Sequence, residues 1–534
     1  MRRITLKVFV LGLDGATFEC LTPLMEQDVI PNIKEICSNW ASGPLRTIFP
    51  PVTGPAWLSL ATGLNPGKTG VFDYINRKSS KGLEMAPVSS AYYENRAIWD
   101  YLGKQGYKVG IYNYPTLSPP PGVNGFVVCG MGGYKKEHLC FPEELEQELN
   151  EVTNGYEVRL NLRSGRYKRN VDLFFEDLNR IITKQAKALK YLIEKKEWDF
   201  FFGVFSFTDW MQHLLWRHID DTHPLYDHKR SPNVKTKFHD TWRRIDEIIG
   251  DLFHSLTDTR YIIVSDHGAG PIDSAFYPNT WLRKKGWLKR KRLGWRSVLA
   301  QRMTPLSADI DNKYFNKLIN IFKTKILETN GTMDLIDLEN SLAYSPEHAG
   351  MFGCINLTQR GREISGFKEQ LVDELNHLTE SLDGVYGVEI YLPELIYSGP
   401  YVDLAPDILF TINKYRASVE IDLTKEAFVY SPSLEMRTGG HRMEGVFIAK
   451  GDIFRNVQLQ NISILDIAPT IMALYNMEIP SQMDGRVITE CIRPELLSSM
   501  NIRKSKEIYE EKQTVKEKGD LEEMKKMLKS LGYI

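Results

Sequence analysis

The side chains best suited to hold divalent cations stand in short motifs of this sequence. Asp266-His267-Gly268 places a carboxylate and an imidazole side by side, before a glycine at which the chain can turn sharply. Asp209 and His213 stand four residues apart, so a helix would put both on one face. Carboxylate oxygen and neutral imidazole nitrogen are good ligands for zinc-like cations. Taken alone, these motifs also fit a surface turn and an N-capping aspartate beside an ordinary histidine.

Two further motifs could complete such a site. His441 follows two glycines that permit close backbone approach, and it stands at the start of an apolar strand. Thr53 lies in PPVTGPAWLSLATG, where Pro55 suits the first turn of a helix that we expect over residues 56–62. The positive end of that helix would favour an alkoxide and a bound phosphate, and a metal ion would activate the hydroxyl. Alternatively, Thr53 is an N-cap and His441 a structural histidine.

Short apolar runs place several of these residues on a sheet. We predict strands at residues 7–13, 107–112, 200–207, 260–265 and 445–449, and helices at 181–195 and 242–255. This alternation predicts an α/β fold, a mostly parallel central sheet with helices on both faces. Asp14, Asp209 and Asp266 each follow a predicted strand, so their carboxylates should converge at the carboxyl edge of one sheet.

Length and composition set the class of protein. The 534 residues suggest about two to four domains, or one large α/β domain with insertions. With 42% hydrophobic and 25% charged residues and a net charge of −1, we expect a soluble protein with no stable nucleic acid partner. Six cysteines without a C-x-x-C pair predict reduced thiols and a cytoplasmic location. We expect no signal peptide and no transmembrane segment, and oligomeric state is left open.

The sequence also predicts how the chain divides into domains. We expect a discontinuous catalytic core at residues 1–270 and 343–492, an inserted basic and aromatic cap at 271–342, and a charged helical tail at 493–534. Residues 283–302 hold nine basic side chains and no acidic one, with Trp287 and Trp295 among them. They predict either a solvated surface or a lid that attracts an anionic substrate or a membrane surface.

The motifs, taken together and in order, resemble the alkaline phosphatase superfamily, and within it the type I phosphodiesterase/nucleotide pyrophosphatase family. The matching text is LGLDGA, FPPVTGPAWLSLATGLNPGKTGVFDY, FTDWMQH, SDHG and GGHR, then ILDIAPTIMALYNMEIPSQMDGRVI. The resemblance implies an alkaline phosphatase-like fold and two divalent ions, expected to be zinc, with manganese or magnesium as alternatives. It implies that one ion is held by Asp209, His213 and His441, and the other by Asp14, Asp266, His267 and the Thr53 hydroxyl.

The same resemblance implies a mechanism in which Thr53 becomes phosphorylated and water then releases the product. The backbone N–H of Gly54 would hold the developing charge. Two departures leave the phosphate-positioning group open: Thr69-Gly70 stands where many relatives have His-Gly, and Tyr74 where diesterases often have Asn. A second ester group could stack on aromatic side chains, for which the candidates are Trp57, Phe72, Tyr74 and Trp210.

The sequence therefore predicts a metal-dependent hydrolase of phosphodiester or pyrophosphate bonds in a small phosphate ester or nucleotide. A phosphomonoesterase or a phosphotransferase could use the same ligands, and a non-catalytic binding protein could have kept the fold. A sulfatase is disfavoured because Thr53 stands where that branch has a modified Cys or Ser with a nearby Arg. The sequence does not identify the physiological substrate.

Overall fold

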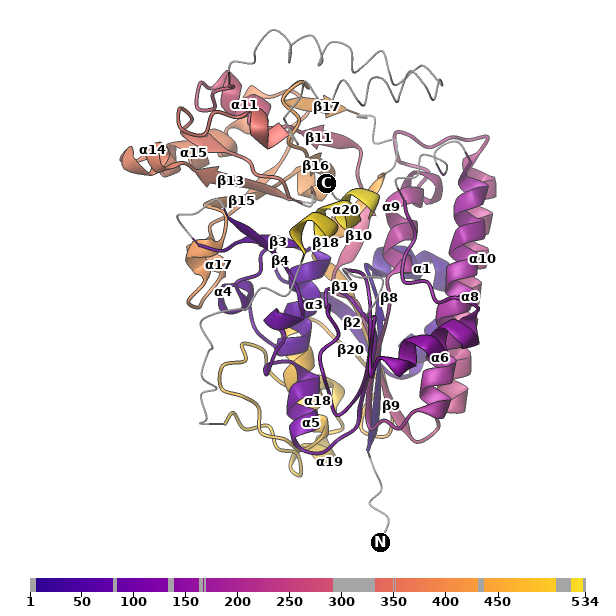
Figure 1. The fold of residues 1–534 in the computed structure, drawn as a ribbon. Helices are drawn as coiled ribbons and strands as arrows, with labels where there is room; N and C mark the ends of the chain where they lie inside the picture. Colours follow the sequence, from indigo (N-terminus) through magenta and orange to yellow (C-terminus); the bar gives the residue numbers. More distant parts are fainter. Residues whose placement is uncertain are drawn as a thin grey trace.

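A computed structural model gives the fold of the chain (Figure 1). It describes residues 6–79, 84–132, 139–162, 167, 170–291, 332–348, 350, 352–430, 437–505 and 520–531. Within these ranges the polypeptide forms a large lobe around one long sheet and a smaller lobe with sheets of its own.

The large lobe is built on a sheet with ten strands among the described residues. Their order is β20 (Val457–Gln458), β2 (Ala41–Arg46), β19 (Glu444–Lys450), β9 (Thr259–Val264), β1 (Lys7–Leu13), β8 (Phe200–Phe205), β5 (Val109–Tyr114), β6 (Gly125–Cys129) and β7 (Cys140–Phe141), with β21 (Ile462–Ser463) beside β2. β1 pairs in parallel with β8 and β9, and β5 pairs in parallel with β8 and β6. β19 is antiparallel to both neighbours. The predicted, mostly parallel sheet is thus confirmed.

Helices cover both faces of this sheet, as predicted. Alternate β1 side chains enter two different apolar cores, Phe9 and Leu11 on one face and Val8 and Val10 on the other. Because both faces are buried, the central strands are continuous apolar runs. The first face carries α1 (Phe18–Glu26), α2 (Pro31–Asn39), α6 (Glu144–Thr153), α8 (Val171–Lys195), α9 (Phe207–Ile219) and α10 (Ser231–Ser255). The second face carries α3 (Thr53–Thr62), α5 (Ile98–Lys104) and α18 (Ile467–Leu474).

The smaller lobe has its own apolar core. One sheet has the order β12 (Ala343–Tyr344), β13 (Gly353–Leu357), β15 (Ile408–Ile412) and β14 (Val388–Tyr391), and another β16 (Ala417–Val419), β11 (Ser274–Phe276) and β17 (Phe428–Tyr430). Its helices include α11 (Pro278–Lys284), α14 (Gln359–Glu363), α15 (Phe367–Asn376), α16 (Leu378–Ser381) and α17 (Pro393–Ile396). This lobe lies over the end of the sheet opposite the N-terminus (Figure 1).

Shorter elements complete the two lobes and the tail. The strand pairs are β3 (Ile75–Arg77) with β4 (Met85–Pro87), and β10 (Gly268–Pro271) with β18 (Gly439–Arg442). The remaining helices are α4 (Pro66–Thr69), α19 (Pro494–Leu497) and α20 (Leu521–Leu531). Single 3-10 turns are η1 (Ser90–Tyr92), η2 (Thr332–Leu335), η3 (Val402–Leu404), η4 (Asn413–Tyr415), η5 (Ile464–Asp466) and η6 (Thr489–Cys491).

The smaller lobe extends beyond the cap that we expected at residues 271–342. Its sheets and core take most of the residues from 343 to 430, which the expected division places in the catalytic core. The apolar strands β13 and β15 resemble strands of the main sheet in composition, but they pair with each other. Residues 292–331, most of the expected cap, lie outside the described residues.

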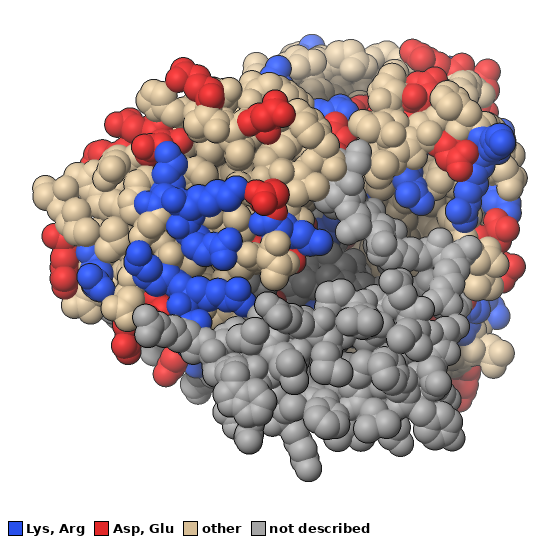
Figure 2. Space-filling model, turned by 90° about the horizontal axis from the view of Figure 1, so that it is seen from above, with Lys and Arg blue, Asp and Glu red and all other residues tan. Residues whose placement is uncertain are grey.

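The described part of the basic segment belongs to this lobe. The Trp287 ring packs edge-on against Trp281 and Phe367, and Lys284 and Lys285 form ion pairs with Glu426 and Glu374. Seen from above, Lys and Arg side chains gather over the smaller lobe, with Asp and Glu near them (Figure 2). Trp295 and residues 292–302 lie outside the described residues, so an anion-attracting lid stays a prediction.

The expected charged tail contains α19 and α20, which are separated by residues 506–519 outside the described part. α20 packs on the body through Met524, Met527 and Leu528, all of which are buried. Among the described helices, none combines the length and the apolar character needed to cross a membrane.

Candidate metal centre

The three carboxylates predicted to converge stand at the ends of adjacent strands. Asp14 directly follows β1, and Asp266 comes two residues after β9. Asp209 lies in the first turn of α9, which starts two residues after β8. Because β8, β1 and β9 are parallel neighbours, their carboxyl ends bring the three side chains to one place, where all are buried.

One group of candidate ligands contains Asp209, His213 and His441. Within α9, His213 Nε2 lies 3.2 Å from Asp209 Oδ2. His441 on β18 adds its Nε2 at 3.1 Å from His213 Nε2 and 3.5 Å from Asp209 Oδ1. Gly439 lets β18 approach, because a Cβ there would clash with the carbonyl of Gln212. Asp209 and His213 do lie on one helix, α9, at the spacing that puts both side chains on one face.

A second group contains Asp14, Asp266, His267 and Thr53. His267 Nε2 lies 3.3 Å from Asp266 Oδ2 and 3.7 Å from Asp14 Oδ1. Thr53 Oγ1 lies 3.2 Å from the same nitrogen. The His267 ring also stacks on His441, with centroids 3.5 Å apart. The candidate ligand atoms of Asp209, His267 and His441 also cluster, so His267 borders both groups.

Backbone carbonyls fix the orientation of all three histidines. The Nδ1 atoms of His213, His267 and His441 lie 2.7, 2.9 and 2.6 Å from the carbonyl oxygens of Gly439, Gly268 and Pro51. A carbonyl can only accept a hydrogen bond, so each Nδ1 donates. The neutral ring then keeps its lone pair on Nε2, which faces the centre. This is the arrangement in which histidine binds a metal ion.

The electrostatics of the site fit a cationic guest. Burial raises the pKa of Asp14, and the charges of Asp266 and Asp209 add to this effect. Burial and the neighbouring His267 lower the pKa of His441, which favours its neutral form. Among the described residues, Asp14 Oδ1 and Asp266 Oδ2 are buried without a hydrogen-bond partner. Buried carboxylates and facing imidazole nitrogens are a donor set that suits a divalent cation.

Thr53 stands at the first position of α3, beyond an extended Val52. The first turn of a helix leaves backbone N–H groups without intrahelical acceptors, so it favours an anion beside Thr53 and Gly54. The Tyr74 ring covers this turn, since a Cβ at Gly54 would lie 3.2 Å from Tyr74 Cδ1. Burial raises the pKa of the Tyr74 phenol, and the charge of Asp14 adds to this, while the Thr53 hydroxyl acts in the opposite direction.

The family model for type I phosphodiesterase / nucleotide pyrophosphatase matches residues 8–340. The chain belongs to this family. The resemblance inferred from the motifs is therefore confirmed, and the family is one of phosphodiesterase and nucleotide pyrophosphatase hydrolases, which supports hydrolase activity in general. The family is metal-dependent, and two candidate ligand clusters lie here, Asp209 with His267 and His441, and Asp14 with Asp266 and His267. No curated protein matches the chain.

His441 lies beyond the residues that the family model matches. Its position therefore rests on the structure, in which β18 pairs with β10 next to Asp266-His267. Ala269 is the direct cross-strand neighbour of His441 in this pair. The phosphodiesterase-family core thus continues past the smaller lobe and returns to the site.

The four aromatic candidates for substrate binding lie in different surroundings. Trp57 lies on α3 and is fully buried, and its ring packs against Tyr114 and Phe202. Trp210 is also buried, in the core on the α9 side. Phe72 lines a large cavity, and Tyr74 lies beside Gly54, the residue after Thr53. Their roles toward substrate stay predictions.

The sequence motifs did not identify some of the side chains that hold the candidate ligands in place. Thr208 Oγ1 donates to the carbonyl of Asp14 at 2.6 Å, and Gln212 Nε2 donates to that of Gly15 at 2.8 Å. The N–H of Gly15 donates to Asp266 Oδ1 at 3.2 Å. Thr208 and Gln212 stand in FTDWMQH beside the ligands, which was the available signal. Asn76 shapes the nearby loop, as its Oδ1 accepts the N–H groups of Phe72 and Asp73.

Proposed function

We propose that this chain hydrolyses phosphodiester or pyrophosphate bonds at a two-metal site, through a phosphothreonine formed on Thr53. The observation that carries the proposal is the position of the Thr53 hydroxyl. It lies at a helix N-terminus, 3.2 Å from the His267 nitrogen that borders both groups of ligands. A hydroxyl placed there has the surroundings that a nucleophile requires.

We assign the seven candidate ligands to two ions. Asp209, His213 and His441 would hold one ion, and Asp14, Asp266, His267 and Thr53 the other. Bound there, divalent cations supply positive charge that favours the ionised hydroxyl and stabilises the oxygens around phosphorus. The mixture of nitrogen and oxygen ligands favours zinc over magnesium.

The side chains and backbone then carry out two displacements. Thr53 Oγ1 loses its proton to solvent and attacks phosphorus, and the bond from phosphorus to the leaving oxygen breaks. The backbone N–H of Gly54 and its neighbours in the first turn of α3 hold the charge on the phosphoryl oxygens. Water next attacks the phosphothreonine from the opposite side and releases the second product. The buried ring of Tyr74 packs beside Gly54 in this first turn of α3.

A parallel assay tests the proposal. Bis(p-nitrophenyl) phosphate and p-nitrophenyl phosphate are given to the protein after reconstitution with zinc, manganese or magnesium. We expect faster turnover of the diester, with the highest rate in zinc. A clear preference for the monoester would replace the diesterase assignment, and no turnover of either would favour a binding protein.

The nucleophile is tested separately. Thr53→Ala should lower kcat/KM by about three orders of magnitude or more, because the group that attacks phosphorus is gone. Thr53→Ser keeps a hydroxyl and should retain substantial activity. Metal content measured on the same samples should stay close to wild type in both variants. Full turnover by metal-loaded Thr53→Ala would exclude the covalent route.

A further inference from the structure

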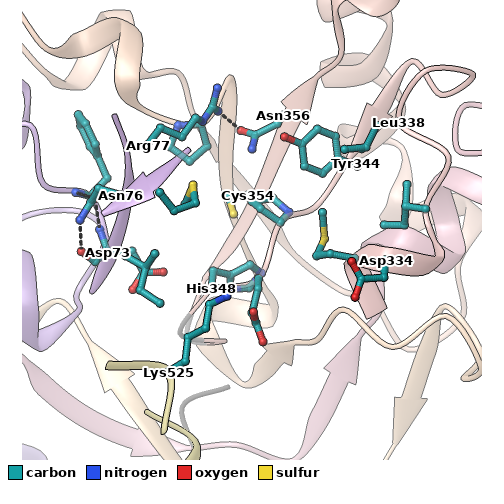
Figure 3. A pocket seen from close by; sticks show the side chains of 18 of the residues that line it. Asp73, Asn76, Arg77, Asp334, Leu338, Tyr344, His348, Cys354, Asn356 and Lys525 are labelled. Atoms are coloured by element: carbon teal, nitrogen blue, oxygen red, sulfur yellow. Dashed lines mark hydrogen bonds between the residues drawn. The ribbon is translucent and has the colours of Figure 1, made fainter. Parts of the chain in front are cut away.

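A cavity of about 690 Å³ lies between the two lobes. Its walls come from the β3–β4 hairpin of the large lobe, from β13 and the segment before it in the smaller lobe, and from α20 (Figure 3). The C-terminal helix contributes Lys525 and Leu528. Cavities of this size at a junction between lobes are typical sites for small ligands.

The cavity wall is built on the same segments as the nucleophile. The Phe352 ring on the wall packs edge-on against Phe49, four residues before Thr53, with centroids 6.1 Å apart. Phe72, also on the wall, stands two residues before Tyr74, whose ring covers the first turn of α3. A ligand that fills the cavity therefore lies next to the chain segments that present Thr53.

The lining favours an uncharged and largely apolar guest. Of the 24 residues that line the cavity, 12 are apolar or aromatic. Five are carboxylates and three are basic, which leaves an excess of two negative charges (5 − 3 = 2). One of the three cations, Arg77, is already engaged with Asn356 and the Ala405 carbonyl. A polyanionic group would meet net repulsion here.

His348 adds one directional polar group to this lining. Its side chain is 7% exposed, and its Nδ1 accepts the N–H of Gly350 at 3.0 Å. Burial lowers the pKa of His348 to about 4, so the ring is neutral at pH 7 and its proton sits on Nε2. Among the described residues, this Nε2 has no hydrogen-bond partner. A buried hydrogen-bond donor without an acceptor costs free energy, so the cavity favours a ligand that offers a hydrogen-bond acceptor to His348.

We infer that this cavity binds one ester group of the phosphodiester substrate, and that this group is uncharged, largely apolar and carries a hydrogen-bond acceptor for His348. The inference rests on the proposed function, which places the phosphate beside Thr53. If the cavity binds this ester group, the C-terminal helix α20 is part of the substrate site, because Leu528 lines the cavity.

A series of alkyl p-nitrophenyl phosphates tests the inference. The alkyl group runs from methyl to decyl, and p-nitrophenyl thymidine 5′-phosphate is the nucleoside comparison. In the wild type, kcat/KM should rise with chain length, by up to about fourfold for each methylene group that becomes buried. A long alkyl ester should exceed the nucleoside ester.

Variants that fill the cavity provide the second arm. Leu528→Trp should bring the ratio of kcat/KM between decyl and methyl esters close to one, and Cys354→Trp is the alternative if that protein fails to fold. Lys526→Trp is the matched control, because it puts the same side chain on the exposed side of α20. The control should keep the wild-type dependence on chain length.

His348→Phe tests the acceptor, since it keeps the ring and removes the N–H. Among decyl analogues in which one methylene is replaced by an ether oxygen, the wild type should favour one isomer by about two- to tenfold. The variant should lose that preference.

The outcomes separate the two proposals. Turnover of the methyl ester without any dependence on chain length, or with preference for the nucleoside ester, overturns the cavity inference and leaves the proposed function standing. An isomer preference that survives in His348→Phe overturns the role of His348. Absence of turnover for every diester overturns both.

Discussion

Gly15 shows how much the candidate metal centre depends on a residue without a functional side chain. Its φ is +67°, a left-handed conformation that glycine adopts at little cost. A Cβ at this position would lie 2.9 Å from Asp209 Oδ1. The residue therefore allows the loop after β1 to pass directly over a carboxylate of the site, and its own N–H donates to Asp266.

We predict that Gly15→Ala lowers the metal content of the protein. Backbone strain alone should cost about 1 kcal/mol of unfolding free energy, and the contact with Asp209 comes in addition. Gly366→Ala is the matched control, because Gly366 also has a positive φ, +76°, but open space around it. Metal analysis of both variants checks this. Equal metal content in Gly15→Ala and Gly366→Ala would show that the contact with Asp209 is unimportant.

The candidate ligands could be chosen from the sequence by residue type, but the groups that orient them could not. Asp, His and Thr side chains carry the oxygen and nitrogen atoms that can bind a metal ion. The ends of predicted strands locate three of them, Asp14, Asp209 and Asp266. The carbonyls that fix the histidines belong to Gly439, Gly268 and Pro51, and every residue has a carbonyl. Residue type therefore does not show which carbonyl groups accept a hydrogen bond from an imidazole.

At the scale of elements, α2 and α10 are joined by one buried carboxylate. Asp246 on α10 accepts the N–H of Asn32 at 3.0 Å and that of Ile33 at 2.8 Å, and also the side-chain amide of Asn32. Asp246 thus satisfies the first turn of α2, which has no side-chain cap of its own at Ile30. A helix start without such a partner would leave buried N–H groups unpaired.

We predict that Asp246→Ala lowers the unfolding free energy by about 2 kcal/mol or more, because it leaves these donors without an acceptor. Denaturant unfolding followed by circular dichroism measures the change. Asp240→Ala on the same helix is the control, since Asp240 is exposed, and its midpoint should stay near wild type. A loss of similar size in both variants would mean that Asp246 does not act as a cap.

Element boundaries were predictable where apolar patterns are strong. The first strand was predicted at residues 7–13, which the structure has as β1, and the strand at 260–265 differs from β9 by one residue at each end. The helix at 242–255 was too short, because α10 already starts at Ser231. Its first turns carry Pro232 and polar residues with few apolar positions, so periodicity gives little signal there.

At the scale of the molecule, contacts between the lobes reach the segment before Thr53. Tyr397, just beyond α17, donates its hydroxyl to the carbonyl of Phe49 at 2.7 Å. The Phe49 ring also stacks on Tyr391 of β14, with centroids 4.0 Å apart. The smaller lobe, which lies outside the central sheet, therefore contacts the segment that precedes α3.

We predict that Tyr397→Phe costs about 1 kcal/mol of stability and lowers kcat/KM, because the Phe49 carbonyl loses its donor four residues before Thr53. Tyr430→Phe is the control, as Tyr430 is 62% exposed. Thermal unfolding and steady-state kinetics on both variants check this. Unchanged kinetics in Tyr397→Phe would show that the lobe contact does not position Thr53.

The division into lobes was the part that sequence could least define. The family motifs lie before residue 271 and after 438, so they outline the core but not what lies between. Strands such as β13 and β15 are short and apolar, and such a strand does not reveal which sheet it joins. Pairing between residues about fifty positions apart is decided by packing that only the fold provides.

The central claim is that two divalent cations are bound side by side by the seven side chains brought together at the sheet edge. Anomalous diffraction at the zinc edge, on crystals of the zinc-loaded protein, tests it most directly. We predict two peaks, one among Asp209, His213 and His441, and the other among Asp14, Asp266 and His267 next to Thr53 Oγ1. A single peak, or peaks away from these residues, would contradict the account.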